Sequence, residues 1–302
     1  MNLLLKAFRR GGFSWFCSRV FYKLQRKTGY LKWKFRNAPA YIDPTHEELE
    51  AIERDLEANN IELVDFCPDP NAFEAFLDSN WFPEGYHGGV ASGVWREKQL
   101  EHWLAAEILN LKELKTDEIY VDVAAASSPW ARELRDRWSM KAFAIDLSAV
   151  PPEFAALDYY RQENATDSSF EDASVSALSL QCAFEMFAGD DDVNFIRELA
   201  RILKPGGRAV ILPLYLHTTY RYYATPDFYE KDHPRQPTGA EKFIRFDCEG
   251  ILASRKYNAT ELIRRIIDPI KASKLRYKLS VLRNKQTFGD DIYCHFILEI
   301  YK

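Results

Sequence analysis

The second half of the chain alternates continuous apolar runs with amphipathic segments. The apolar runs predict strands over residues 118–125, 141–148, 174–181 and 208–216. Apolar residues spaced three and four apart predict helices over 129–138 and 192–203. Strands that alternate with helices and are apolar on both faces are typical of a parallel sheet covered on both sides. We therefore expect an α/β protein with a mostly parallel, doubly wound sheet.

The end of the chain departs from this alternation. A helix is expected over 260–267, and two strands, over 276–283 and 291–301, follow it with no helix between them. Such a hairpin-like ending adds an antiparallel C-terminal strand to the parallel sheet. The expected sheet is therefore mixed.

Residues 43–117 have a different pattern, acidic and helical. Thr45 and Glu48 form a capping box, which predicts a helix starting at Thr45, and a short helix follows over 71–77. A glycine-rich loop over 85–93 precedes another helix, whose expected apolar face consists of Trp95, Leu100, Trp103, Leu104 and Ile108. We expect this part of the chain to form a helical cap or linker.

Residues 1–42 are basic and aromatic. They contain no Asp or Glu and ten Lys or Arg residues, although the net charge of the whole chain is -5. After two glycines, Phe13, Phe16, Val20 and Leu24 recur at helical spacing, with cations mostly on the other side. A basic amphipathic helix of this kind suits an anionic membrane surface, to which residues 1–36 are expected to bind.

A helix that packs on the main domain with its lysines in water explains the same pattern, and both interpretations stay open. Nucleic acid is not expected as a partner, because nothing else in the chain supports it.

Composition narrows the class of protein. The hydrophobic fraction of 47% and the charged fraction of 28% are those of a globular protein in water. No apolar run approaches the roughly 20 residues that cross a bilayer, and MNLLLKAFRR lacks the long apolar region of a signal peptide. The five cysteines are far apart and form no CxxC pair, which indicates neither a metal site nor a disulfide framework. We expect a cytoplasmic protein without a metal, peripheral on the inner membrane face where its N-terminus binds.

Polar residues follow the expected strands at their carboxyl ends, where open parallel sheets bind ligands. Asp122 ends the first strand and Asp146 the second, and an acid in the second position can accept hydrogen bonds from both hydroxyls of a ribose. Asn164-Ala165 comes next, and the segment LARILKPGG over 199–207 forms a tight turn before the strand at 208–216.

These segments, in this order and at these spacings, resemble the class I S-adenosylmethionine-dependent methyltransferases, nearest the small-molecule, methyltransferase type 11-like subgroup. LARILKPGG is similar to the turn L-x-x-(L/V)-L-K-P-G-G before that family's fifth strand. The resemblance covers about 118–216 and implies a Rossmann-like methyltransferase fold with S-adenosyl-L-methionine as cofactor. It implies that Asp146 binds the ribose and that Asn164 and Ala165 lie beside the adenine. A nicotinamide-binding domain also has an acid after its second strand, but it does not predict the KPGG turn.

The first motif departs from the family pattern (D/E)-x-G-x-G-x-G. Asp122 is retained, but Ala124, Ala126 and Ser128 occupy the glycine positions. Glycine suits these positions because the backbone takes unusual dihedrals and approaches the ligand closely. Alanine and serine are the smallest substitutes, and Ser128-Pro129 is typical of an N-cap followed by a first-turn proline. We expect all four residues to contribute to cofactor binding, with the helix N-terminus facing the methionine carboxylate.

The resemblance implies in-line attack on the sulfonium methyl group, for which positioning supplies most of the catalysis. A hydroxyl nucleophile also gains from a general base. His217, which follows the strand over 208–216, is the preferred candidate, and Glu185 is a second catalytic candidate. A histidine that merely lines a loop explains His217 equally simply.

The stretch from about 217 to 257 is long, aromatic and cationic, and it is expected to be a substrate insertion. Candidate contacts to a sugar or an anionic group are Tyr215, Tyr220, Arg221 and Arg245. An ordered loop that packs by its tyrosines is the alternative.

The sequence thus predicts three parts: a basic N-terminal segment (1–42), a helical cap or linker (43–117) and a methyltransferase-like Rossmann domain (118–302). The leading hypothesis is methyl transfer to an oxygen of a small or glycan-type acceptor in a surface-polysaccharide or lipid-linked pathway. The alternative is a catalytically inactive methyltransferase fold that serves as a binding or scaffold protein, suggested by the replaced glycines.

Overall fold

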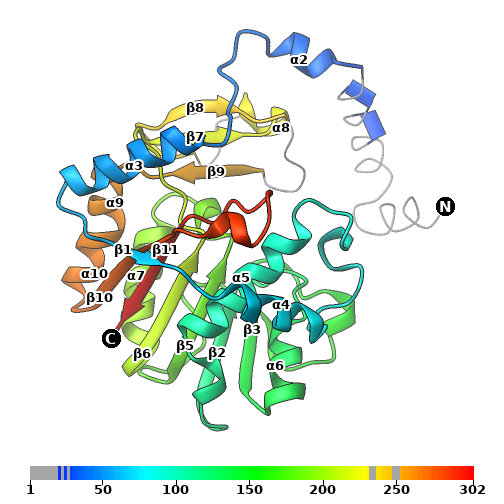
Figure 1. Cartoon of the computed structure of the whole chain (residues 1–302), viewed down its shortest axis with the longest axis vertical. Coiled ribbons are helices and arrows are strands. Elements are labelled where there is room, and N and C mark those ends of the chain that lie inside the picture. Colours follow the sequence, from blue (N-terminus) through cyan, green and yellow to red (C-terminus); the bar gives the residue numbers. More distant parts are fainter. Residues whose placement is uncertain (1–19, 22–23, 26–27, 231–235, 247–251) are drawn as a thin grey trace.

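The centre of the protein is an eight-stranded sheet with the order β1-β10-β11-β6-β5-β2-β3-β4 (Figure 1). The computed structural model describes residues 20–21, 24–25, 28–230, 236–246 and 252–302. The strands of this sheet are β1 (Leu63–Phe66), β2 (Ile119–Val123), β3 (Lys141–Asp146), β4 (Tyr160–Gln162), β5 (Val175–Gln181), β6 (Leu203–Leu212), β10 (Arg276–Leu282) and β11 (Phe296–Tyr301).

All strands of this sheet except β11 run in the same direction. β11 is antiparallel to β10 and to β6, and the other pairs are parallel. β2 pairs with β3 on one side and with β5 on the other, which places a topological switch point, the usual ligand site of such sheets, between β2 and β5. The structure confirms the Rossmann-like, mixed α/β sheet with an antiparallel C-terminal strand.

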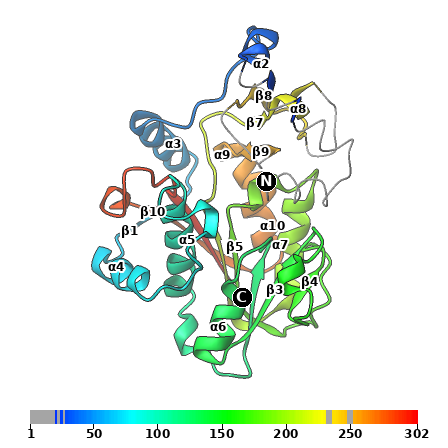
Figure 2. The ribbon, with the colours of Figure 1, turned by 90° about the vertical axis from the view of Figure 1, so that its right-hand side faces the viewer.

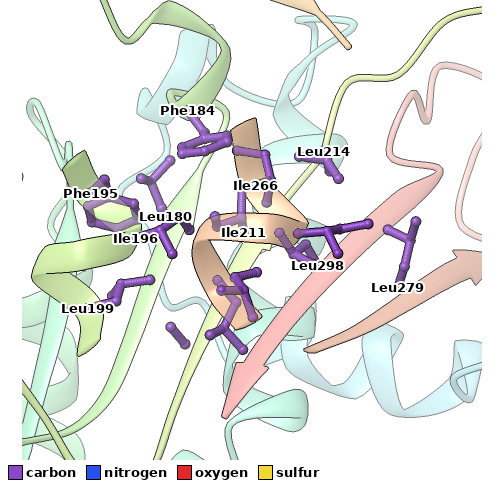
Figure 3. Packing of buried hydrophobic residues seen from close by; sticks show 14 of the residues in the cluster. Leu180, Phe184, Phe195, Ile196, Leu199, Ile211, Leu214, Ile266, Leu279 and Leu298 are labelled. Carbon is purple, nitrogen blue, oxygen red and sulfur yellow. The ribbon is translucent and has the colours of Figure 1, made fainter. Parts of the chain in front are cut away.

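Helices cover both faces of the sheet (Figure 2). One core contains side chains of α4 (Pro70–Asp78), α5 (Trp95–Ile108) and α6 (Trp130–Trp138). The other contains side chains of α7 (Asp191–Ile202) and of the continuous helical segment formed by α9 (Ala259–Leu262), η5 (Ile263–Ile267) and α10 (Asp268–Ala272). Figure 3 shows this second core, where Phe195 and Leu199 of α7 lie near Leu180 of β5. Each such buried side chain stabilises the fold by about 1.5–3 kcal/mol.

Helix α5 is buried along most of its length, which its apolar pattern did not predict. Leu100, Trp103 and Leu104 of its expected apolar face lie in the core, but Glu97, Glu101 and His102 are also 4% exposed or less. The carboxylate of Glu97 accepts hydrogen bonds from the backbone N–H groups of Tyr293 and Cys294, at 3.0 and 3.2 Å. The loop before β11 therefore covers the polar side of the helix.

The expected substrate insertion forms a second sheet. Its strands are β7 (Arg221–Ala224), β8 (Glu241–Ile244) and β9 (Ala253–Lys256), in the order β8-β7-β9. Figure 1 shows this small sheet above the edge of the large sheet at which the parallel strands end.

A buried acid attaches the small sheet to the Rossmann core. Asp192 of α7 is fully buried and accepts hydrogen bonds from Arg255 of β9, from Tyr257 Oη at 2.7 Å and from Arg265 Nε at 2.8 Å. Burial raises the pKa of Asp192, but hydrogen bonds from Arg265 and the charge of Arg255 outweigh burial and hold it below its ordinary value. The two guanidinium groups also donate to the carbonyl of Gly189.

Residues 43–117 are not purely helical, which corrects the expected cap. Helix α3 (His46–Ala58) has the predicted capping box of Thr45 and Glu48. Beyond it, however, β1 joins the large sheet in parallel beside β10. A run of only four residues has no periodicity that distinguishes a strand from a loop. The helical cap is therefore continuous with the Rossmann sheet.

The KPGG turn requires its glycines for physical reasons. A Cβ on Gly207 would lie 2.8 Å from the carbonyl oxygen of Lys204 and 3.0 Å from that of Val175, closer than real contacts. Gly206 has a φ of 80°, in the left-handed region. Its N–H donates to the carbonyl of Lys302 at 2.9 Å, so the turn also fixes the end of β11.

Candidate active site

The loop after β2 keeps the backbone shape for which glycine is normally used. Ala124 has a φ of 57° and Ala126 a φ of 47°, although neither is glycine. Each left-handed alanine costs about 1–2 kcal/mol. The Ala126 N–H donates to Asp146 Oδ2 at 2.9 Å, and the Ser148 N–H donates to Asp146 Oδ1 at 2.7 Å. The carboxylate of Asp146 therefore holds the loop in this shape.

Asp122 is buried at the end of β2 without a hydrogen bond to either carboxylate oxygen among the described residues. Burial and the nearby charge of Asp146 raise its pKa to about 8. An acid in this state is neutral at pH 7 and gains from any cationic group that approaches it.

Helix α6 begins one residue later than the sequence predicted. Pro129 is the N-cap and Trp130 the first helical residue. Ser128 nevertheless supplies the cap, because its Oγ accepts a hydrogen bond from the Trp130 N–H at 3.2 Å. The N-terminus of α6 follows the β2 loop directly, as expected for a site that binds an anionic group.

Residues Asn164 and Ala165 lie in a turn after β4, where Asn164 Oδ1 accepts hydrogen bonds from the Thr166 N–H and hydroxyl, both at 3.0 Å. A shallow hollow lies beside the β2 loop, bounded by Ala126, Asp146 and Tyr160 among others. It adjoins the carboxylate that the sequence assigned to the ribose.

A second group of polar side chains lies beyond the ends of β5 and β6, and we call it the inner polar cluster. It consists of Lys98, Glu101, Cys182, Glu185, Tyr215, Lys256 and Tyr293. Val123 of β2 is in register with Leu180 of β5, so the β2 loop and Cys182 leave the same edge of the sheet. The cluster and the β2 loop therefore lie at neighbouring strand ends.

Hydrogen bonds connect most of the inner polar cluster. Lys98 Nζ donates to both oxygens of Glu101 at 2.9 Å, and Tyr293 Oη donates to Glu101 Oε1 at 3.3 Å. Cys182 Sγ lies 3.5 Å from Tyr215 Oη and 3.7 Å from Tyr293 Oη. Burial raises the pKa of the Cys182 thiol to about 12, so it stays protonated and does not serve as a nucleophile.

Of the two predicted catalytic residues, the structure places Glu185 in this cluster. The Oε2 of Glu185 is buried and has no hydrogen-bond partner among the described residues, and burial raises the pKa of Glu185.

His217, the other predicted catalytic residue, follows β6, and its backbone N–H donates to the Tyr257 carbonyl at 2.8 Å. Burial and the charge of Arg221 lower the pKa of His217 to about 4, while its Nε2 is buried without a partner in the described part of the chain.

The four predicted substrate contacts divide between the cluster and the small sheet. Tyr215 belongs to the inner polar cluster, and Tyr220 is buried with an exposed fraction of 7%. Arg221 Nε donates to Thr219 Oγ1 at 2.9 Å. The guanidinium of Arg245 donates to both oxygens of Asp43, at 3.0 and 2.7 Å. The two arginines are thus held within the protein by polar partners.

The sequence analysis did not predict four residues of the inner polar cluster: Lys98, Glu101, Lys256 and Tyr293. Acidic and basic residues on an apolar helix such as α5 normally face water, and no periodicity marks a buried lysine in a four-residue strand. The only available signal was the closely spaced charges of α5.

The order of the strands, with antiparallel β11 inserted between β10 and β6, is that of the Rossmann-like methyltransferase fold. Residues 121–211 match the family described as "Methyltransferase domain". This part of the chain is a class I S-adenosylmethionine-dependent methyltransferase domain.

Several solved structures are similar to this chain at low identity. 1,6-Didemethyltoxoflavin-N1-methyltransferase of Burkholderia thailandensis is 16% identical over 80% of this chain and 93% of that one, with a TM-score of 0.46. Geranyl diphosphate C-methyltransferase of Streptomyces coelicolor is 15% identical over 78% and 99%, with a TM-score of 0.40. The YcgJ protein of Bacillus subtilis is 15% identical over 67% and 98%, also at 0.40. None of the curated proteins matches the chain.

The residues present fit S-adenosylmethionine, the cofactor of this family. The orphaned carboxylate of Asp122 can hold an ammonium group, and Asp146 keeps one free lone pair on each oxygen for the ribose hydroxyls. Asn164 and Ala165 follow the next strand, on the side expected for the adenine. No group of three His, Cys, Asp or Glu able to hold a metal ion was found among the described residues.

We predict that glycine at the two left-handed positions stabilises the protein. The double variant Ala124→Gly, Ala126→Gly removes the strain and should raise the free energy of unfolding by about 0.5–2 kcal/mol, measured by urea denaturation. Ala125→Gly is the matched control, because Ala125 has no positive φ and is buried; it should lower the same quantity by about 1 kcal/mol. A loss of stability in the double variant would contradict the observed loop shape.

We also predict that Asp122 makes stability depend on pH. Its pKa of about 8 in the folded protein exceeds the ordinary value of 3.8, so the folded state binds more protons than the unfolded state between these values. Stability therefore falls as pH rises from about 4 to 8, and Asp122→Asn should remove a fall on the order of a few kcal/mol. Thermal unfolding across this range measures it. The exposed acid Asp117 supplies the control: Asp117→Asn should keep the wild-type pH dependence.

Proposed function

We propose that this methyltransferase transfers the methyl group of S-adenosylmethionine to a hydroxyl oxygen of a small or glycan-type acceptor. The observation that carries the proposal is the pair of acids at the ends of adjacent strands, Asp122 and Asp146, beside a buried polar cluster at the ends of β5 and β6. A cluster of amines, carboxylates and phenols suits an acceptor rich in hydroxyl groups better than an apolar one.

The cofactor supplies an activated methyl group on a sulfonium when it is bound. The chain's part is to bind and orient both molecules, with Asp122 and Asp146 at the cofactor end and the inner polar cluster at the acceptor end. The small sheet lies above this edge (Figure 1).

Calorimetric titration with S-adenosylhomocysteine tests cofactor binding. Asp146→Ala should weaken binding at least about tenfold, because two charge-assisted hydrogen bonds to the ribose are lost. Asp158→Ala, an exposed acid outside the strand ends, is the control and should bind like the wild type. Absence of heat and of any thermal shift with the wild type would refute the proposal and favour the alternative of an inactive binding or scaffold protein. Transfer of labelled methyl groups to soluble or lipid extracts then identifies the acceptor.

We further propose that the N-terminal arm binds an anionic membrane surface, which would suit a lipid-linked or surface-polysaccharide acceptor at the inner membrane face. Helix α2 (Tyr30–Lys34) packs on the small sheet through Leu31, and Trp33 is 62% exposed. Phe21 and Leu24 are also exposed, at 62% and 55%. Residues 1–19, with Phe13 and Phe16 of the expected amphipathic helix, lie outside the described residues. No described helix is long and apolar enough to span a membrane.

Sedimentation with vesicles that contain anionic phospholipid tests this surface. The triple variant Phe21→Ser, Leu24→Ser, Trp33→Ser should lower the bound fraction at least about tenfold, because each side chain contributes apolar burial. Val90→Ser, Leu147→Ser removes two equally exposed apolar residues outside the arm and should sediment like the wild type. Equal sedimentation of both variants would rule out the arm as the anchor.

A further inference from the structure

We propose that Lys256 is the general base of the methyl-transfer reaction and that the inner polar cluster binds the compound that is methylated. This inference rests on the proposed function and assigns the base to a residue in the small sheet. If a general base is needed, the methyl acceptor is a compound with a hydroxyl group that must lose its proton as the oxygen attacks the methyl group.

The position of Lys256 is the first argument. Lys256 is the last residue of β9 and is only 2% exposed. Its Nζ lies 3.3 Å from the centroid of the Tyr215 ring, 5.3 Å from that of Tyr223 and 5.8 Å from that of Tyr41. Because side chains alternate along a strand, Arg255 points to Asp192 while Lys256 points to the opposite side, toward the cluster. The amine is thus fixed by packing at the acceptor end.

The second argument is the carboxylate that faces this amine. Strand β9 packs against η4 (Phe184–Met186), which carries Glu185 directly after β5. Glu185 Oε1 accepts from Cys182 Sγ at 3.7 Å, while Oε2 has no partner among the described residues. A buried carboxylate oxygen without a partner costs about 1–3 kcal/mol or more. A substrate hydroxyl that donates to this oxygen would be oriented beside Lys256.

The charged and titratable groups around Lys256 come from several elements. They are Glu185 of η4, Cys182 after β5, His217 after β6, Asp43 before α3 and Arg245 after β8, with Tyr41, Tyr215 and Tyr223 around the amine. Burial lowers the pKa of Lys256 to about 8, although Glu185 acts to raise it. A fraction of the molecules therefore carries the free amine at neutral pH, as a general base requires.

The other groups of the cluster do not compete for this role. Lys98 lies against Glu101, whose charge outweighs burial and keeps the pKa of the lysine above its ordinary value. The thiol of Cys182 and the phenol of Tyr215 are both held protonated, because burial raises their pKa values. Lys256 is the cluster's only described cation whose pKa is lowered.

In the proposed reaction, the methyl group passes to the acceptor oxygen, and the proton of the hydroxyl group passes to Lys256. The acceptor oxygen forms a bond to the methyl carbon as the bond from that carbon to sulfur breaks, and the bonding pair stays on sulfur. The hydroxyl proton passes to Nζ of Lys256. The products are the methyl ether, S-adenosylhomocysteine and the ammonium form of Lys256, which then returns its proton to solvent.

The test compares Lys256→Met, Glu185→Gln and the control Lys242→Met. Lys242 is also a lysine of the small sheet whose amine lies over a ring, 5.0 Å from the Tyr229 centroid, but it donates to Gln236 and lies outside the cluster. Lys256→Met should lower kcat/KM by roughly 10²- to 10⁴-fold while the affinity for S-adenosylhomocysteine stays within threefold. Methyl α-glucoside, methyl α-galactoside and phenol serve as acceptor probes with methyl-labelled cofactor, and circular dichroism confirms folding.

The pH profile separates a base from a structural lysine. Wild-type kcat/KM should rise with pH and level off above about 8, because the free amine is the active form. Glu185→Gln removes the carboxylate that raises the pKa of Lys256, so it should move this inflection to lower pH. The pKa of the Lys256 side chain can also be measured by NMR titration without any methyl acceptor, with the signal assigned by its absence in Lys256→Met. The pKa values of the wild type and of Glu185→Gln should match the inflections of their rate profiles.

The outcomes distinguish the two proposals. If the wild type binds no S-adenosylhomocysteine, the proposed function fails. If Lys256 titrates at its ordinary value near 10.5, or if Lys256→Met keeps the wild-type rate and pH profile, Lys256 is not the base, whatever the wild type methylates. Loss of activity in Glu185→Gln but not in Lys256→Met would assign the base to Glu185.

Discussion

The buried carboxylate of Asp192 is the interaction on which the arrangement of the two sheets depends. It accepts hydrogen bonds from Arg255 and Tyr257 of the small-sheet segment and from Arg265 of η5, so one acid holds two segments against α7. Removing one partner from such a network leaves a buried, uncompensated charge, which typically costs 3–5 kcal/mol. Because Lys256 follows Arg255 directly, the position of its amine at the edge of the large sheet is set by this acid.

A second constraint acts at the other end of the site. The strain of two left-handed alanines is offset by the carboxylate of Asp146, which holds the loop through the N–H of Ala126. Burial raises the pKa of Asp122, and the charge of the same Asp146 carboxylate raises it further, so the two acids at this loop are electrostatically coupled. Loss of the glycines has therefore changed the energy of the loop rather than its shape, and this loop shape favours an active enzyme over a scaffold.

The sequence predicted β2, β3, β5, β6, β10 and β11 of the large sheet from their apolar runs, but it missed the short strands β1 and β4. It also predicted the KPGG turn, which admits only glycine at Gly207. It predicted Asp122 and Asp146 because strand ends are fixed once the strands are known. The small sheet and Lys256 could not be predicted in this way. The strands of the small sheet have four residues each and contain cations such as Arg255, which no hydrophobic pattern marks as buried. Their burial depends on contacts with Asp192 and Tyr215, which are distant in the chain.

The small sheet also connects the N-terminal arm to the reaction. Leu31 and Phe35 pack against Ile244 of β8, while Lys256 of β9 reaches the acceptor site from the same three-stranded sheet. Strand β7 lies between β8 and β9 and pairs with both, so the contacts of α2 and the proposed base belong to one three-stranded sheet.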